Sequence, residues 1–327
     1  MGRVRVGLIG RGTAGTLFHA PLIRAVPDLE LAAVAGSDGA AALIGDAAID
    51  LVVIATPNAT HFPLARAALE AGKHVVVDKP FAVTVAEADA LIALAAARGR
   101  VLSVFHNRRW DGDFLTVREI LDSGALGEVM LYEAHWDRFR PAIKAGWREQ
   151  AQGEGAGLLF DLGPHLIDQA LVLFGTPDAT AADVAVQRAG AVADDYFQLT
   201  LSYGPRRRVV LGASNLIAAP RPRFAVYGTK GALITRGLDG QEAALRAGAS
   251  PGDPAFGAAT GHVRVTRTGA DGDGEDVAVL PGRWIAYYEA MVDAIRGRGP
   301  VPVAPADAAA GLRLIEAAHG ARPGSRS

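Results

Sequence analysis

The stretch VGLIGRGTAGTLFHAPLI, residues 6–23, places three glycines directly after a short apolar run. Gly10, Gly12 and Gly15 have the spacing G-x-G-x-x-G, and a helical pattern follows them. This spacing allows a tight turn, a close approach of the backbone to a pyrophosphate, and close packing of helix on strand. The N-terminus of the helix also presents unpaired N–H groups to the anion. The alternative is a glycine-rich turn that only begins a helix. The predicted dinucleotide-binding loop comprises Gly10, Gly12, Thr13, Ala14 and Gly15.

Charge and composition exclude several classes of partner. The chain has 327 residues, 50% of them hydrophobic, and 33 basic against 35 acidic side chains give a formal charge of -2. This balance does not provide the basic surface that a nucleic-acid backbone needs, so we expect no nucleic-acid partner. The absence of cysteine excludes disulfides, thiolate-ligated zinc and cysteine nucleophiles. No apolar run approaches the roughly 20 residues that span a bilayer, so we expect no membrane partner and a soluble, cytoplasmic protein.

Short apolar runs alternate with helical patterns over the first third of the chain. Near-continuous Val, Ile and Leu strands separated by helices are typical of a parallel sheet covered on both faces. We therefore predict an α/β fold in which residues 1–104 form an N-terminal Rossmann-type parallel sheet. The expected strands are residues 4–9, 29–35, 50–56, 74–79 and 101–106.

From about residue 128 onward, longer strands alternate apolar with polar residues, and turns rich in Gly, Pro and Asp separate them. This pattern indicates a largely antiparallel sheet. Two amphipathic helices are expected near residues 284–296 and 305–319. We predict that residues 105–327 form an α+β domain with a large, mainly antiparallel open sheet for substrate binding and oligomerisation. One face of such a sheet stays available to a partner, which predicts a homodimer or homotetramer.

The end of the second expected strand, AAVAGSD at residues 32–38, bears on the choice between NAD and NADP. NAD sites usually place an acid here for the adenosine ribose. Gly36 takes that position, Ser37 follows it, and Asp38 comes two positions late. An uncharged strand end does not repel a 2′-phosphate and the Ser37 hydroxyl can donate to one, so NADP is favoured over NAD. The alternative is that Asp38 turns back to the ribose.

The interval after this strand is unusually short. Only residues 36–50 separate it from the next strand, where a doubly wound domain normally has a further helix and strand. No basic residue that would hold a 2′-phosphate lies between Arg24 and Arg66. Either the domain is trimmed here or part of the natural chain is missing.

Three valines at residues 75–77 lead into Asp78, Lys79 and Pro80. Strands of an open α/β sheet present ligand contacts at their carboxyl ends, so this tripeptide is expected to face the same crevice as the glycine loop. Proline ends the strand and disfavours a helical backbone at Lys79. The Lys79 ammonium can then stabilise a substrate alkoxide during hydride transfer to a nicotinamide. The alternative is an ordinary solvated strand end.

GAGLLFDLGPHLIDQALVLFG, residues 155–175, predicts a helix that Pro164 bends or delays. Asp161, His165 and Asp168 share one stripe of this helix. An acid one turn before a histidine can accept its ring proton, and histidine suits a general base for an alcohol proton. A buried capped histidine or a surface pair would explain the same residues. Metal binding is a weaker alternative because the nicotinamide already supplies the redox chemistry, so no metal is expected.

Hydroxyl-rich substrates need many fixed donors and acceptors, which FHNRRWD (residues 105–111) and the segment near residue 148 supply. Any one arginine there can instead form a salt bridge between domains. The predicted substrate-pocket residues are Asn107, Arg109, Trp110 and Arg148.

Taken in order, these motifs resemble the Gfo/Idh/MocA family of oxidoreductases over nearly the whole chain. The similar segments are GLIGRGTAG, ATPNATHFPLARAALEAGKHVVVDKP, SVFHNRRWDGDF, GEVMLYEAHWDRFRP and GLLFDLGPHLIDQALVLFG. The family usually has Glu-Lys-Pro where this chain has Asp78-Lys79-Pro80, although several similar members share VVVDKPF. Similar members also have a longer segment after the second strand.

The resemblance implies an NAD(P)-dependent dehydrogenase that acts on a secondary alcohol of a polyol or sugar, most similar to members of the NADP-dependent scyllo-inositol 2-dehydrogenase type. It implies that Lys79, Asp161 and His165 are catalytic and that Asp161 and His165 also contact the substrate. Alternatives are an NAD-assisted glycosidase of the same family and a non-catalytic dinucleotide sensor. The residues implied to line the nicotinamide are Thr56, Pro57, Asn58, His61, Asp78 and Lys79. Pro57, Asn58 and His61 can also be explained as the start of a helix.

Overall fold

A computed structural model of the chain describes residues 2–144, 146, 149, 155–253, 255–259, 261–267 and 274–320. The chain forms two compact units. The first comprises Met1–Trp110, Gly240–Ala258 and Arg283–Leu312, and the second comprises Asp111–Asp239, Ala259–Gly282 and Arg313–Ser327. The chain therefore leaves the first unit after Trp110 and returns to it twice. The division of the sequence at residue 104 stays a prediction.

The first unit contains a five-stranded parallel sheet with the order β2-β1-β3-β4-β5. All four side chains of β3 and the three valines of β4 are buried, as expected for a sheet covered on both faces. The predicted Rossmann-type parallel sheet is confirmed. Its strands are β1 (Val4–Ile9), β2 (Leu29–Ala35), β3 (Leu51–Ile54), β4 (His74–Asp78) and β5 (Leu102–Phe105).

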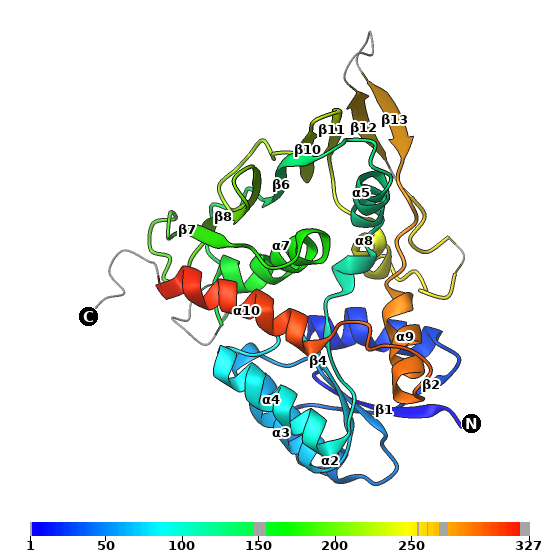
Figure 1. Cartoon of the computed structure of the whole chain (residues 1–327). Helices are drawn as coiled ribbons and strands as arrows, with labels where there is room; N and C mark the ends of the chain where they lie inside the picture. The colour runs from blue at the N-terminus through cyan, green and yellow to red at the C-terminus, as the bar shows by residue number, and fades with distance from the viewer. Residues whose placement is uncertain are drawn as a thin grey trace. The chain divides into compact units, whose positions relative to one another are not determined.

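Helices connect these strands. A π-helical segment (Ala14–His19) leads into α1 (Ala20–Ala25), and the other connecting helices are α2 (Ala40–Gly45), α3 (His61–Glu70) and α4 (Val85–Arg98). Two later elements join the same unit: α8 (Gln241–Arg246) and α9 (Ile285–Ile295), of which α9 contacts α1. Figure 1 shows α2, α3 and α4 grouped together beside the parallel strands. The two terminal helices were predicted, and the last of them, α10 (Pro305–Gly320), continues from the first unit into the second.

The short interval after β2 is closed without a strand. All of residues 36–50 are described, and they form a 3-10 turn (Ser37–Gly39) followed by α2. The next strand, β3, pairs directly with β1, so β2 remains at the edge of the sheet. The connection is therefore shorter than in a doubly wound domain, which has a further strand outside this position.

The second unit contains an eight-stranded sheet with the order β13-β12-β11-β10-β6-β9-β8-β7, in which only the β6–β9 pair is parallel. Burial alternates along β8, where Phe197, Leu199 and Leu201 are fully buried and their neighbours are not. The predicted mainly antiparallel sheet is confirmed. Its strands are β6 (Val129–Asp137), β7 (Ala179–Ala185), β8 (Tyr196–Tyr203), β9 (Arg207–Ser214), β10 (Phe224–Gly228), β11 (Gly231–Thr235), β12 (His262–Arg267) and β13 (Glu275–Ala278).

The sequence prediction missed both edge strands of this sheet, β7 and β13, because the strands expected here were residues 128–139, 195–203, 207–214, 223–229, 231–236 and 262–268. Their residues are mostly exposed and give no strong apolar alternation, because an edge strand buries little. It also missed α5 (Gly112–Asp122), whereas α7 (Leu158–Phe174) was predicted and runs as one helix through Pro164. None of the helices in the described part of the chain has the length and apolar character needed to cross a membrane.

Candidate active site

The carboxyl ends of the five parallel strands are in register. Ala35 pairs with Ile9, Ile9 with Ile54, Ile54 with Val77, and Val77 with Val104. The residues that follow these positions emerge at one edge of the sheet, which we call the carboxyl edge. This edge is where open α/β sheets bind ligands. The predicted residues that it presents include Gly10, Ser37, Thr56, Asp78, Lys79 and Asn107.

The glycine loop has the backbone geometry of a pyrophosphate-binding turn. Gly10 has a φ of +129°, and a Cβ added there would overlap the carbonyl oxygen of Ala55. A Cβ at Gly15 would overlap the carbonyl oxygen of Gly10, whereas one at Gly12 would meet no atom within 4 Å. No side chain caps the helical segment that begins at Ala14. The loop therefore fits a pyrophosphate, which needs a close backbone and free N–H groups at a helix start.

The end of β2 carries both side chains that bear on cofactor choice. Ser37 and Asp38 are exposed and begin the 3-10 turn. A Cβ added at Gly36 would lie 2.6 Å from Oδ1 of Asp38, so the Asp38 carboxylate turns back toward the strand end. The Ser37 donor and the alternative acid are thus both present at this position.

Lys79 lies in a turn that Asp78 helps to fix. The Asp78 carboxylate ends β4 and accepts a hydrogen bond of 2.9 Å from the backbone N–H of Lys79. The peptide bond between Lys79 and Pro80 is cis, and Lys79 is half-buried. The lysine is therefore held at the carboxyl edge by the residue before it.

A buried histidine, His19, lies next to Asp78 in this turn. The fully buried His19 places Nδ1 2.6 Å from the Tyr288 hydroxyl and Nε2 3.8 Å from Oδ1 of Asp78. Burial acts to raise the pKa of Asp78, but the neighbouring His19 ring and the charge of Lys79 hold that pKa below its ordinary value. Asp78 therefore stays ionised next to Lys79. Burial also raises the pKa of Tyr288 well above its ordinary value, so its hydroxyl keeps its proton.

His61 ties the TPNATH loop to the Lys79 turn. Its Nδ1 lies 2.8 Å from the carbonyl oxygen of Pro80, and its Nε2 lies 3.0 Å from that of Thr56. A neutral imidazole has one N–H and can donate to only one of these carbonyls. Burial lowers the pKa of His61 and outweighs the carbonyl contacts and the charge of Asp78, so we take the ring as neutral near pH 7. His61 thus begins α3, as the helix-start alternative held, and also links two loops of the edge.

The expected substrate residues after β5 make contacts inside the first unit. They lie in a 3-10 turn, Asn107–Trp110. Asn107 is buried, Arg109 forms an ion pair of 3.2 Å with Asp307, and Trp110 packs edge-on against Tyr287. Arg109 therefore has a structural partner, and its role toward a substrate stays a prediction. Arg148 lies outside the described residues.

The predicted acid and base lie on α7 in the second unit. Asp161 and His165 are one turn apart on the continuous helix, which places them on one face. Arg138 forms an ion pair of 3.5 Å with Asp161, and the ring of His165 packs against Trp136 with centroids 5.8 Å apart. The pairing with Arg138 was not predicted. In the described residues, no group of three or more His, Asp or Glu side chains is placed to hold a metal ion.

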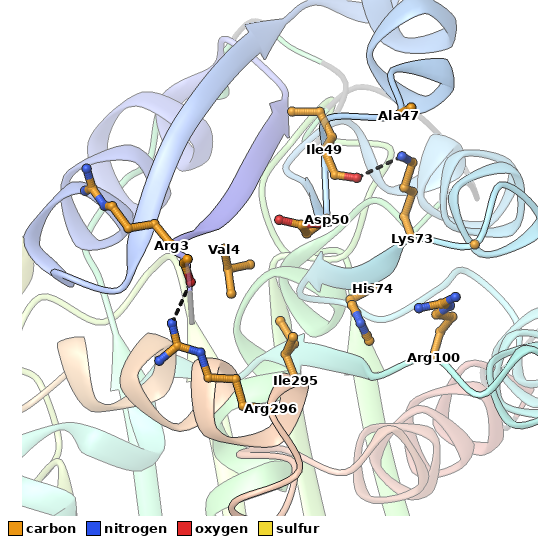
Figure 2. Close-up of a pocket in the computed structure, with 12 residues that line it drawn as sticks. Arg3, Val4, Ala47, Ile49, Asp50, Lys73, His74, Arg100, Ile295 and Arg296 are labelled. Carbon is orange, nitrogen blue, oxygen red and sulfur yellow. Dashed lines mark hydrogen bonds between the residues drawn. The ribbon is translucent and has the colours of Figure 1, made fainter.

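A separate pocket of about 520 Å³ lies at the opposite edge of the same sheet, which we call the amino edge (Figure 2). Two of its lining cations, Lys73 and Arg296, bind the main chain. Lys73 donates to the carbonyls of Asp46 and Ile49 at 2.6 and 2.8 Å, and Arg296 donates to that of Gly2 at 2.9 Å. Because these donors are used by the fold and the strands begin here, we assign this pocket no part in the candidate site.

Sequence reasoning missed His19 and Tyr288. His19 occupies a buried position in the helical segment after the glycine loop, and a polar residue at a core position was the available signal. Tyr288 lies 269 residues further along the chain, so no local pattern connects it to His19.

A glycine loop and an anchored lysine at the carboxyl edge of a parallel sheet are typical of a dinucleotide-binding oxidoreductase. Comparison with known proteins agrees. Residues 4–106 match the model of an oxidoreductase family described as an NAD-binding Rossmann fold, and residues 118–326 match that of its C-terminal alpha/beta domain. The chain belongs to the Gfo/Idh/MocA family of oxidoreductases.

Three relatives show how far the similarity extends. "Uncharacterized oxidoreductase YdgJ" of Escherichia coli is 48% identical, covering 96% of this chain and 94% of the relative. "scyllo-inositol 2-dehydrogenase (NADP(+)) IolW" of Bacillus subtilis is 37% identical, covering 96% of this chain and 92% of the relative. A solved structure of a protein from Yersinia pestis is 45% identical with a TM-score of 0.92, covering 98% of this chain and 95% of that one.

Proposed function

We propose that this oxidoreductase transfers hydride between a nicotinamide cofactor, with NADP favoured over NAD, and a secondary alcohol of a polyol or sugar, with an inositol-like substrate favoured. The observation that carries the proposal is the Lys79 turn at the carboxyl edge, the same edge of the sheet that carries the glycine loop. The similarity to IolW, which is named as an NADP-dependent dehydrogenase of scyllo-inositol, supports both the substrate class and the cofactor.

The chain's own residues would act on the substrate hydroxyl. The Lys79 ammonium stabilises the negative charge that develops on the hydroxyl oxygen. A positive charge placed at this point lowers the free energy of the transition state. The His165 ring takes the hydroxyl proton during oxidation and returns it during reduction. Asp161 orients the ring, and Asp161 is itself held by the ion pair of 3.5 Å with Arg138. The nicotinamide ring supplies the hydride acceptor or donor.

A substrate panel tests this function. Inositols, aldoses and polyols are supplied with NADP and with NAD, and the absorbance of the reduced nicotinamide is followed. We expect turnover with a cyclic polyol, faster with NADP. Sugar release from a glycoside without net reduction of the cofactor would favour the glycosidase alternative, and binding of cofactor without turnover of any substrate would favour the sensor.

A histidine pair tests the assigned base. His165→Asn removes the proposed proton acceptor, so kcat is expected to fall by about 10²- to 10⁴-fold. His262→Asn removes an exposed imidazole of β12 in the same unit and is expected to leave kcat unchanged. Equal kcat values for wild type and a folded His165→Asn protein would contradict the assignment.

We also propose that the protein assembles as a homodimer or homotetramer. Helix α7 packs on the second sheet through β9, β8 and β6, and a sheet of this size offers its other face to a second copy. Light scattering after size exclusion measures the mass of the particle against that of one 33.9 kDa chain.

A further inference from the structure

The glycine loop brings a cation to the end of β2. Arg11 lies between Gly10 and Gly12, and the N–H of Gly10 donates to the carbonyl of Ala35 at 2.9 Å. This bond joins the loop to the last residue of β2. A Cβ added at the next residue, Gly36, would lie 3.8 Å from Nη1 of Arg11. The guanidinium of Arg11 therefore reaches the strand end where the adenosine ribose binds in Rossmann domains.

The guanidinium of Arg11 is not used by the fold. Within the described part of the chain, Arg11 forms no hydrogen bond and no ion pair, and its side chain is exposed. The Asp38 carboxylate approaches the same point at Gly36 but is not within ion-pair distance of Arg11. By contrast, Arg5 at the start of β1 forms an ion pair with Glu30 at 2.7 Å. The guanidinium therefore offers an unpaired positive charge to an anion beside a residue that has no side chain.

Arg11 supplies a cation near the end of β2, where the neighbouring sequence has none. No lysine or arginine lies between Arg24 and Arg66, so the segment after β2 provides no cation for a 2′-phosphate. A phosphate needs such a partner, and a planar guanidinium binds two of its oxygens at once. Gly36 adds no side chain that would fill the space, and the Ser37 hydroxyl is exposed beside it.

We infer that Arg11 is the residue that selects NADP, by binding the 2′-phosphate of the adenosine ribose together with Ser37. This inference rests on the proposed function and states which cofactor the proposed dehydrogenase uses. Asp38 opposes Arg11: its carboxylate repels a 2′-phosphate and accepts a hydrogen bond from the 2′-hydroxyl of NAD. The balance between Arg11 and Asp38 sets the preference.

The test measures binding of cofactor and of adenosine fragments to the full-length chain by calorimetry, without substrate. The probes are NADP, NAD, adenosine 2′,5′-bisphosphate and 5′-AMP; within each pair the two differ by the 2′-phosphate. For Arg11→Ala, we expect the ratio of the NAD to the NADP dissociation constant to fall by about 10- to 100-fold, the range of a charge-assisted hydrogen bond. The fragment ratio should fall by the same factor.

Two further variants complete the test: one is a control, and the other is expected to change the ratios in the opposite direction. Arg24→Ala removes the same charge from the exposed last turn of α1 and should leave both ratios unchanged. Asp38→Asn should shift both ratios toward NADP and its fragment. Raising the salt concentration should weaken NADP binding more in wild type than in Arg11→Ala, because one charged contact is lost.

Different outcomes separate this inference from the proposed function. If Arg11→Ala weakens NADP and NAD by equal factors, Arg11 contacts a part that both cofactors share, and the inference is overturned. An unchanged ratio in Arg11→Ala overturns it as well, while the dehydrogenase proposal stands. If wild type binds neither cofactor, the proposed function fails together with the inference.

Discussion

The two edges of the five-stranded sheet carry similar side chains and use them differently. At the amino edge, Lys73 and Arg296 donate to main-chain carbonyls, and His74 accepts from the N–H of Val101 at 3.0 Å. At the carboxyl edge, His19 contacts the side chains of Tyr288 and Asp78, and His61 contacts the carbonyls of Pro80 and Thr56, which belong to the loops of the candidate site.

This difference distinguishes residues that stabilise the fold from residues that prepare a site. A side chain bonded to a buried carbonyl satisfies a backbone group, and its removal leaves that group unpaired. Side chains that bond to one another beside the candidate site, or to the main chain of its loops, hold that site in place instead. The amino edge therefore predicts effects on stability, and the carboxyl edge predicts effects on turnover and binding.

The largest expected contrast is between the lysines of the two edges. Lys79→Ala is expected to lower kcat by about 10²- to 10³-fold, the effect of removing one donor that stabilises an oxyanion. Lys73→Met leaves two buried carbonyls without their donor, so the free energy of unfolding should fall by about 1–3 kcal/mol while kcat of the folded protein is kept.

Steady-state kinetics and thermal unfolding measure both variants. Each variant is the control for the other, because each removes one ammonium group from the same sheet. A Lys73→Met protein that folds normally but turns over slowly would remove the distinction between the edges. A Lys79→Ala protein with wild-type kcat would remove Lys79 from the site.

The carboxyl edge could be predicted from the sequence because its signals are local. The glycine spacing and the tripeptide at the end of β4 are each read within a few residues, and the alternation of strands and helices places them at one edge. The turn at Lys79 needed no knowledge of distant residues. Thus the first unit's sheet was largely predictable, whereas the roles of its site residues stay predictions.

The contacts of the amino edge and those of His19 with Tyr288 and Asp78 were not predictable, because they join residues that are distant in the sequence. Lys73 follows an ordinary helix end, and only the fold shows that it is buried against Asp46 and Ile49. Tyr288 reaches His19 because α9 returns to the first unit after the chain has formed most of the second. The reach of Arg11 to Gly36 likewise depends on the pairing of β1 with β2.

The second contrast compares two glycines with positive φ. Gly10→Ala should destabilise the protein by at least about 2 kcal/mol more than Gly72→Ala, because the added methyl overlaps the carbonyl of Ala55 and forces β1 and β3 apart. Gly72 at the amino edge has a φ of +76°, and the nearest atom to an added Cβ is 3.8 Å away, on Arg100. Gly72→Ala should therefore show only the backbone penalty, about 1 kcal/mol.

Denaturant unfolding and cofactor titration measure this pair. NADP affinity should fall in Gly10→Ala and stay at the wild-type value in Gly72→Ala. Equal losses of stability with unchanged affinity in both would mean that the turn at Gly10 has no special role in cofactor binding.

The smallest expected effect concerns the histidines of the two edges and the pH. Burial lowers the pKa of both His61 and His74 from the ordinary value of 6.5, and the charge of Arg100 adds to the effect at His74. The unfolded chain therefore binds more protons than the folded chain as the pH falls through 6.5. The contribution of the two neutral histidines to stability is full above this pH and is lost below it.

We expect the melting temperature of wild type to decrease between pH 7.5 and 5.5, and both His74→Asn and His61→Asn to flatten this decrease. Only His61→Asn should also lower kcat at pH 7.5, because His61 contacts the carbonyl of Pro80 beside Lys79. His74 contacts the N–H of Val101, away from the turn. A fall in kcat for His74→Asn equal to that for His61→Asn would show that the two edges are coupled, and the division of roles between them would have to be given up.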